Sequence, residues 1–546
     1  MSALATADVI PLRRTHHPVA SWLPGAREPS FDAAGIASVA AEVREPVHVV
    51  AGRTGTAVGV ALGGDATVSD EGYRLLGTLP PLYPEWLGDR SFGEAHGVRF
   101  PYIAGEMANG IATTTMVVAM ARAGMLGFFG AGGLAPDAVE QAVGELAREL
   151  GDLPNWGVNL IHSPNEPSIE ERVAELLVDR RVPIVSASAF MALTPAVVRC
   201  AVSGLQADAG GAVVRRTRVF AKVSRPEVAA QFMAPAPGEI LRTLLDRGQI
   251  TAREAELAAR IPVAEDITVE SDSGGHTDNR PLMALLPSIL ALRDDVIREH
   301  GYDRPIRIGA AGGLGTPEGV AGAFALGAAY VVTGSVNQAC VEAGISGAAK
   351  KMLAQADVAD VIMAPAADMF EQGVRLQVLR RGTMFAPRAA RLYETYRTYG
   401  GLDEIPPDVR ARLETDVLRK PIDDIWAATA AFWRERDPGE LARAEADPKH
   451  RMALVFRWYL GKASRWAIDG DPTRRVDYQI WCGPAMGAFN RWTAGTFLAE
   501  PSRRTVVQVA LNLLEGAAVI TRAHQLRTYG APVPAQAFAF HPRELT

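Results

Sequence analysis

The sequence predicts an α/β protein built around a parallel (β/α)8 TIM barrel. Between Arg99 and Thr333, short apolar segments alternate with helix-like stretches. Strands that are apolar throughout and separated by helices indicate parallel pairing with both faces covered. Eight repeats within roughly 250 residues are typical of this barrel, and an open doubly wound sheet is the alternative. The predicted strands are Phe100–Gly105, Met125–Gly130, Trp156–Ile161, Val182–Ser186, Arg218–Val223, Asp266–Glu270, Ile306–Ala310 and Tyr330–Thr333.

The connection after the fifth predicted strand is longer than a barrel needs. It runs over about 226–263 and contains two helical patterns, Glu239–Asp246 and Thr251–Arg260. Thr251 and Glu254 have the spacing of a capping box, which marks the start of the second helix. We expect a helical hairpin inserted into the barrel.

The chain of 546 residues is about twice as long as one compact domain, so we expect regions beside the barrel. The barrel is assigned to 96–385. The N-terminal region, 1–95, has a helical stretch and a β-hairpin pattern, which predicts a small α+β unit. The C-terminal region, 386–546, has long amphipathic stretches and six of the nine tryptophans, which predicts helices around an aromatic core.

Composition excludes several classes of protein. A net charge of −6, with 48% apolar and 22% charged residues, is typical of a globular chain and argues against disorder or a basic nucleic-acid binder. Cys200, Cys340 and Cys482 lack the spacing of metal ligands, which favours a reducing, cytoplasmic setting. The first 22 residues carry no secretory pattern. The uncharged run 319–341 holds several polar residues, so we interpret it as buried structure and not as a membrane span.

Two Gly-rich loops follow the seventh and eighth predicted strands. The first holds Gly312 and Gly313, and the second holds Thr333, Gly334 and Ser335. Glycines let backbone N–H groups approach an anion, and a helix N-terminus adds a favourable dipole. Either loop alone is also typical of an ordinary tight turn. Because they occur as a pair where barrels often hold a phosphorylated cofactor, they predict a phosphate site.

A polar segment, Glu270–Pro281, directly follows the sixth strand, where barrels place catalytic groups. It contains Ser273, Gly274, Gly275 and His276. Histidine titrates near neutrality and can give or take a proton, while the glycine pair leaves room for a planar ligand. A loop histidine that only caps a helix is the alternative, and the position in the barrel favours catalysis.

Other candidates are less distinctive. Lys222 ends the fifth strand and would direct a cation into the barrel mouth, unless it extends along the surface. Asn159 ends the third strand and could offer its amide to a ring carbonyl or imide, or bond to loop backbone. Cys340 is expected to be a buried, inert thiol and not a nucleophile. The segment Arg375–Arg397 holds six arginines against one acid, which is typical either of a solvated helix face or of a docking patch for an acidic partner or a cofactor phosphate.

Several motifs together resemble the nitronate monooxygenase and FMN-dependent enoyl-reductase superfamily. They are Gly105-Glu106-Met107-Ala108-Asn109-Gly110, Ala123–Gly130, Gly157-Val158-Asn159, Ser273-Gly274-Gly275-His276, and Ala311-Gly312-Gly313 with Gly327-Ala328. The stretches that more closely resemble the trans-acting enoyl reductases of polyunsaturated fatty acid and polyketide synthases are Glu270–Leu282, Gly309–Ile345, Met363–Phe370 and Trp481–Asn490. The resemblance extends from about Leu79 to Leu514. After Gly-Gly-His, Thr277–Arg280 replaces the small apolar residue and Gly usual in the monooxygenases, which weakens the case for nitronate chemistry.

The resemblance implies FMN as cofactor, NADPH (or NADH) as electron donor and a carrier-bound 2-enoyl thioester as substrate. It implies an acyl carrier protein and a polyketide or fatty acid synthase as partners, without nucleic acid or membrane, and allows a homodimer. The predicted cofactor-binding residues are Gly105, Met107, Asn159, Lys222, Ser273, Gly274, Gly275, Gly312, Gly313, Thr333, Gly334 and Ser335.

His276 and Lys222 are the predicted catalytic residues. His276 would give a proton or a hydrogen bond to the substrate, and Lys222 would place positive charge beside the reduced flavin. The expected function is enoyl reduction in polyketide or polyunsaturated fatty acid synthesis. The alternatives are a nitronate monooxygenase and a non-catalytic synthase scaffold. The regions that flank the barrel are expected to shape an acyl channel and to dock the carrier.

Overall fold

The computed structural model describes residues 20–546, so the prediction that no secretory pattern is present concerns residues mostly outside the described range. Backbone contacts divide the chain into two compact units. The smaller unit joins Met1–Tyr83 to Ala518–Phe540, and the larger one joins Pro84–Ala517 to His541–Thr546. The proposed boundaries near residues 95 and 385 stay a prediction. Each unit is described by itself below.

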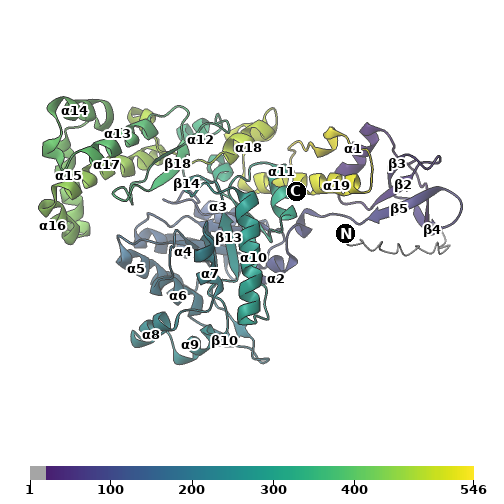
Figure 1. The fold of residues 1–546 in the computed structure, drawn as a ribbon, viewed down its shortest axis with the longest axis horizontal. Coiled ribbons are helices and arrows are strands. Elements are labelled where there is room, and N and C mark those ends of the chain that lie inside the picture. The colour runs from purple at the N-terminus through teal and green to yellow at the C-terminus, as the bar shows by residue number, and fades with distance from the viewer. Residues whose placement is uncertain (1–19) are drawn as a thin grey trace, which may run out of the picture. The chain divides into compact units, whose positions relative to one another are not determined.

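The larger unit contains a closed barrel of eight parallel strands in the order β12-β13-β15-β16-β6-β7-β8-β9. Figure 1 shows one of these strands, β13, among the helices of this unit. The predicted barrel is therefore confirmed. Two strands begin two residues later than predicted, after Pro101 and after Pro183, because proline has no N–H to donate to a strand ladder. The strands are β6 (Tyr102–Ala104), β7 (Leu126–Phe129), β8 (Trp156–Ile161), β9 (Ile184–Ser188), β12 (Arg218–Val223), β13 (Asp266–Glu270), β15 (Arg307–Ala311) and β16 (Val331–Thr333).

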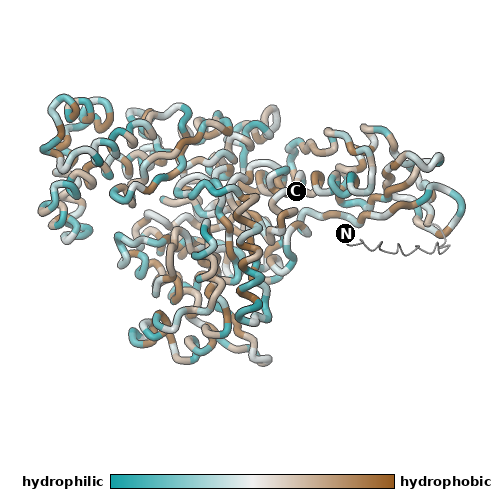
Figure 2. Tube along the Cα trace, viewed as in Figure 1, coloured by the Kyte–Doolittle hydropathy of each residue, from teal (hydrophilic) through white to brown (hydrophobic). Residues whose placement is uncertain are grey.

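Helices separate the barrel strands. Proline stands in the first turn of α4, α5, α6, α7 and α11, where its missing N–H leaves no helical bond unmade. The helices of this part are α2 (Arg90–His96), α3 (Thr114–Arg122), α4 (Pro136–Leu150), α5 (Pro167–Asp179), α6 (Pro195–Val202), α7 (Pro226–Met233), α8 (Gly238–Asp246), α9 (Ala252–Ala258), α10 (Leu282–His300), α11 (Pro317–Ala325) and α12 (Gly347–Leu353). Helix α10 is hydrophobic in its first half and hydrophilic in its second half (Figure 2).

The predicted insertion is present as α8 and α9. The capping box of Thr251 and Glu254 forms as expected, with both reciprocal hydrogen bonds. Gly248, between the two helices, has a φ of +64°, which glycine adopts without strain. The sequence interpretation missed α7, which follows β12 and takes the place of the ordinary barrel helix. A minor hairpin of β10 (Gln206–Ala207) and β11 (Val213–Val214) was also missed.

A small antiparallel sheet beside the barrel was not predicted. It has the order β14-β18-β17 and is built from β14 (Gly275–His276), β17 (Val361–Pro365) and β18 (Arg375–Leu379). Its strand β14 is the Gly-His pair of the predicted catalytic segment. Short strands with mixed polarity give no clear alternation, which explains why the sequence did not reveal them.

The helical C-terminal region is confirmed. Its core includes the buried rings of Phe370, Phe385, Phe456 and Tyr459, and four of the tryptophans pack against it, so their role is packing. The helices are α13 (Phe385–Thr398), α14 (Pro407–Arg412), α15 (Ile422–Arg436), α16 (Pro438–Ala446), α17 (Pro448–Asp469), α18 (Ala485–Thr493) and α19 (Val506–Thr528).

The smaller unit is an α+β unit, as predicted for its N-terminal part. The expected hairpin is present, with Val47 paired to Leu62. The hairpin belongs to a larger sheet in the order β3-β2-β5-β1-β4, three strands of which were missed. The elements are β1 (Ala20–Leu23), α1 (Ala33–Ala41), β2 (Val47–Ala51), β3 (Val58–Leu62), β4 (Asp65–Val68) and β5 (Tyr73–Leu79). Ala523 and Leu526 of α19 join its core.

The uncharged run 319–341, helix α19 and the cysteine thiols are largely buried inside the protein. The uncharged run 319–341 folds into α11, β16 and a short 3-10 helix and is largely buried, as predicted. Among the described residues, α19 alone has the length and composition to cross a membrane, but 78% of that window is buried inside the protein, as in a core helix. All three cysteines are free and buried, and burial raises the pKa of Cys200 and of Cys482 to about 12.

Candidate active site

The candidate site lies at the carboxyl ends of the barrel strands. Side-chain contacts link the ends of β6, β12 and β13 there. Lys222, on β12, lies between two carboxylates, with its Nζ 3.1 Å from Oε1 of Glu106 and 3.3 Å from Oε1 of Glu270. The hydroxyl of Ser273 donates to Oε1 of Glu270 at 3.2 Å. A chain of polar contacts thus joins three loops at the barrel mouth.

The charge of Lys222 is offset by its surroundings. Burial alone would lower the pKa of Lys222, but the charges and hydrogen bonds of Glu106 and Glu270 outweigh it and the pKa is raised. The ammonium therefore stays protonated. Two carboxylates around one ammonium leave the cluster with a formal charge of −1. The free positive charge that the sequence suggested at this position is therefore compensated within the site.

His276 lies on β14 and is paired with an acid that the sequence did not indicate. Its Nε2 is 3.1 Å from Oδ1 of Asp368, and the two side chains are 37% and 57% exposed. Burial lowers the pKa of His276, but the hydrogen bond and charge of Asp368, with the charge of Glu270, raise it above its ordinary value against the opposing charge of Lys222. The same hydrogen bond and charge hold the pKa of Asp368 below its usual range, although burial acts in the opposite direction.

The two Gly-rich loops contain open positions. An added Cβ would meet nothing within 4 Å at Gly313, which has a φ of +69°, or at Gly334. A Cβ on Gly312 would instead come within 2.6 Å of Oγ of Ser271, so this glycine is needed for close packing. The hydroxyl of Ser335 accepts a hydrogen bond from the backbone N–H of Gly483 at 3.1 Å. Gly313 and Gly334 therefore leave open space on the loops that follow β15 and β16, and a side chain at either position would occupy that space.

Other predicted cofactor residues are engaged with the protein. The Asn159 amide donates to O of Ser186 at 3.0 Å and to Oγ of Ser188 at 2.8 Å. Only its carbonyl oxygen remains for a ligand, and that atom can accept a hydrogen bond but not donate one. The Thr333 hydroxyl is 2.5 Å from the Tyr102 hydroxyl and accepts from the side chain of Asn337 at 3.0 Å.

Gly105 and Met107 build the loop after β6. The N–H of Gly105 donates to O of Thr333 at 2.9 Å, and a Cβ there would come within 2.8 Å of Val332. Met107 is buried, and its carbonyl accepts from Ala112 at 3.1 Å. These contacts fix the backbone next to Glu106.

A segment from the C-terminal region packs onto the mouth, and no sequence pattern indicated this role. A Cβ on Gly483 would come within 2.9 Å of the N atom of Gly274, and a Cβ on Gly274 within 2.8 Å of the N atom of Cys482. Gln377, on β18, donates to Oδ1 of Asp272 and to O of Ser273, both at 2.7 Å. These residues hold the Gly-Gly-His segment from outside the barrel.

The Arg-rich segment is mostly neutralised. Arg388 forms an ion pair with buried Asp477, and Arg391 is 3.6 Å from Asp416. Arg381 is 3.2 Å from Asp360, which also lies 3.9 Å from Arg380. The net positive charge counted along the sequence is therefore largely balanced by acids from other elements.

Comparisons with known proteins agree with this fold. A family model described as "Nitronate monooxygenase" matches residues 91–413. A second model, the inserted helical domain of [acyl-carrier-protein] S-malonyltransferase, matches residues 399–478. The chain therefore contains an oxidoreductase barrel, and it belongs to the nitronate monooxygenase family. The superfamily resemblance predicted from the motifs is confirmed.

The similar proteins point to one branch of that family. The enoyl reductase domain of MlnA, from the macrolactin biosynthesis cluster of Bacillus amyloliquefaciens, is 37% identical with a TM-score of 0.78, over 81% of this chain and 99% of that one. A polyunsaturated fatty acid synthase component of Thraustochytrium sp. is 47% identical over 81% of this chain, and polyketide biosynthesis protein PksE of Bacillus subtilis is 43% identical over 82%. The chain spans 30% and 58% of the lengths of these last two proteins.

Proposed function

We propose that this chain is an FMN-dependent enoyl reductase that reduces the 2,3 double bond of carrier-bound enoyl thioesters, with NADPH or NADH as electron donor. The observation that carries the proposal is its similarity to the MlnA enoyl reductase domain over nearly the whole of that domain. The related synthase proteins support a place in polyketide or polyunsaturated fatty acid synthesis.

The residues at the mouth fit a phosphorylated planar cofactor. Gly313 and Gly334 leave open space for a phosphate beside backbone N–H groups. A Cβ on Gly275 would meet no atom closer than 4.0 Å, which leaves room next to His276. The carbonyl oxygen of Asn159 would be the group that accepts from a ring N–H, since its amide N–H groups are already bonded. When bound, FMN would supply the hydride chemistry, while the protein orients it and excludes competing reactions.

His276 is the proposed proton donor to the substrate. It is partly accessible, it is hydrogen bonded to a carboxylate, and its pKa is raised, so a protonated imidazole is favoured. Lys222 has a different proposed role. Because Glu106 and Glu270 surround it, it holds these two acids in place and limits the negative charge beside the flavin.

The proposed partners are an acyl carrier protein and the synthase to which it belongs. The match of residues 399–478 to a helical domain of a carrier-dependent transferase supports carrier contacts in this region. A cytoplasmic location and a homodimer stay predictions.

The decisive experiment begins with the colour of the purified protein. We expect a flavin absorbance band at about 450 nm. Denaturation should release the flavin, which should be identified as FMN. Under anaerobic conditions, NADPH should bleach this band, and a carrier-bound 2-enoyl thioester should restore it with formation of the saturated thioester. A colourless protein that binds no FMN would instead favour the synthase scaffold.

Nitronate oxidation is the second candidate, favoured by the family model that covers 91–413. It predicts oxygen consumption with an alkyl nitronate and no reoxidation by the enoyl thioester in the absence of oxygen. The same reduced protein, divided between the two substrates, distinguishes the two reactions.

A further inference from the structure

The loop that joins β17 to β18, residues 366–374, passes beside the candidate catalytic histidine. Strand β18 pairs with β14 so that His276 lies opposite Leu376. Asp368 of this loop places Oδ1 3.1 Å from Nε2 of His276. The acid and the histidine are 92 residues apart in the chain, so only the fold brings them together.

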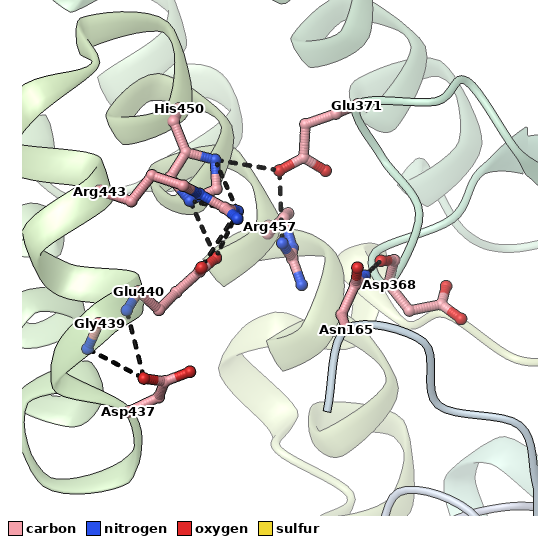
Figure 3. A network of polar contacts seen from close by, with 9 residues as sticks. All are labelled: Asn165, Asp368, Glu371, Asp437, Gly439, Glu440, Arg443, His450 and Arg457. Atoms are coloured by element: carbon pink, nitrogen blue, oxygen red, sulfur yellow. Dashed lines mark hydrogen bonds and ion pairs between the residues drawn. The ribbon is translucent and has the colours of Figure 1, made fainter. Parts of the chain in front are cut away.

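The barrel and the helical region both anchor this loop. From the barrel side, Nδ2 of Asn165 donates to the carbonyl oxygen of Asp368 at 2.8 Å (Figure 3). From the helical side, the fully buried ring of Phe370 lies 5.4 Å from that of Tyr393 and 5.1 Å from that of Tyr396. The backbone of Asp368 and of the residues that follow it is thereby fixed.

Glu371 adds a polar anchor on α17. Its Oε1 is 3.3 Å from Nη1 of Arg457 and 3.6 Å from Nδ1 of His450 (Figure 3). Nε2 of His450 is in turn 2.9 Å from Oε1 of Glu440 on α16. Asp368, Phe370 and Glu371 thus have separate tasks, since the first faces His276 and the other two hold the loop to the helical core.

The contact determines which ring nitrogen of His276 is available. An ionised carboxylate only accepts hydrogen bonds, so Nε2 must carry the hydrogen. Within the described part of the chain, Nδ1 of His276 makes no hydrogen bond. In the imidazolium form, Nδ1–H is therefore the group left to meet a ligand.

We propose that Asp368 is the positioning residue of His276, that it fixes Nε2–H and so makes Nδ1–H the proton donor, and that the helical region maintains this geometry through the loop 366–374. The inference rests on the proposed function for the identity of the acceptor. In the step, the N–H bond at Nδ1 breaks and a C–H bond forms at the α-carbon of the substrate enolate. The imidazolium becomes a neutral imidazole, and Asp368 remains a carboxylate.

The charges that face His276 come from three elements. Asp368 and Glu270 favour the imidazolium, whereas Lys222 and burial disfavour it. Arg457 acts indirectly, because it helps to keep Asp368 ionised. Removal of the Asp368 charge should therefore lower the pKa of His276. Since the protonated form is active, activity in the variant should be lost at a lower pH than in the wild type.

The test measures the ring directly as well as the reaction. The NMR titration of His276, assigned by its disappearance in His276→Gln, should move to lower pH in Asp368→Asn. The high-pH limb of kcat should move in the same direction, with a loss of at least about tenfold at pH 8. FMN content should not change. Asp278→Asn is the matched control, because that acid pairs with Arg225 and not with His276, and it should titrate like the wild type.

An unchanged His276 titration in Asp368→Asn would overturn the proposal whatever the enzyme does. Because this readout needs no turnover, it stays valid if the protein proves not to be an enoyl reductase. If Asp368→Asn unfolds, Asp368→Glu should restore the titration and Asn165→Ala should give a smaller shift in the same direction. The assignment would also be contradicted if His276 titrates in Asn165→Ala as in the wild type and Asp368→Glu does not restore its titration.

Discussion

Two histidine–carboxylate pairs stand at opposite ends of the barrel. Asp266 is the first residue of β13, and its Oδ2 lies 3.0 Å from Nε2 of His96, with exposed fractions of 1% and 0%. Arg307 donates to both oxygens of the same carboxylate, at 2.6 and 2.7 Å. At the other end, His276 and Asp368 lie 3.1 Å apart but are 37% and 57% exposed.

Because the two histidine–carboxylate pairs differ in exposure, one can serve stability and the other can serve proton transfer. The fully buried His96–Asp266 pair, together with Arg307, stabilises the end of the barrel where β13 and β15 begin. No ligand reaches this pair. An accessible pair contributes little to stability because water screens it, but it can exchange a proton with a ligand. Distance alone does not separate the two pairs. Burial does.

The largest expected effect tests the buried pair. Asp266→Asn leaves Arg307 buried without its counter-charge, so the free energy of unfolding should fall by about 3–5 kcal/mol. Urea unfolding followed by circular dichroism measures this. Asp469→Asn, in an exposed pair with Arg465, should change it by less than about 1 kcal/mol. Equal losses in both variants would remove the distinction between buried and exposed pairs.

The stabilisation that the buried Asp266 carboxylate provides should also depend on pH. Burial would raise the pKa of Asp266, but His96 and Arg307 lower it below its usual range. The stabilisation is therefore complete above the unfolded carboxyl pKa of about 3.9 and is lost as the pH falls through the lower folded value. The stability difference between the wild type and Asp266→Asn should be constant above about pH 5 and should shrink as the pH falls from about 5 to about 2. A constant difference over that range would contradict the assignment.

For the accessible pair, His276 and Asp368, we expect a loss of activity without a loss of stability. His276→Ala should retain its FMN and its melting temperature, while kcat for the enoyl thioester falls by about 100-fold, which corresponds to about 2.7 kcal/mol in the barrier. Full activity in this variant would rule out the catalytic role. A large loss of stability would instead place His276 with the structural pair.

The open glycines of the mouth give a fourth expectation. Gly334→Val meets no protein atom within 4 Å of its Cβ, so the fold should tolerate it while FMN binding weakens by at least about tenfold. Fluorescence titration with FMN measures the affinity. Gly238→Val, which has the same open surroundings at the start of α8, should bind FMN normally.

A smaller effect is expected where the C-terminal region touches the mouth. Gly483→Ala brings a methyl group within 2.9 Å of Gly274 and must displace the Gly-Gly-His loop slightly. We expect a loss of FMN affinity and kcat of a few fold, by the same assays. Gly461→Ala, on α17 with open space around it, is the control. Wild-type behaviour of Gly483→Ala would show that this contact does not support the site.

The barrel could be predicted closely because its information is local. The eight apolar segments were recognised from neighbouring residues, and β8, β12 and β13 have the predicted bounds. The loops with Gly313, Gly334 and His276 were located because barrels place functional loops after their strands. Asp368, Gln377 and Gly483 were not connected with the site, because they come from segments 92 to 148 residues away from their partners.

The local pattern of residues predicted the order of the eight barrel strands and the positions of the loops that can meet at the mouth. It did so because apolar periodicity and turn residues act over a few neighbours. Only the tertiary structure decided that Lys222 is neutralised by two acids, that His276 has a carboxylate partner and that the Arg-rich segment is paired. Charge compensation depends on distances of a few ångström between side chains that are remote in sequence, and it is complete only when the chain has folded.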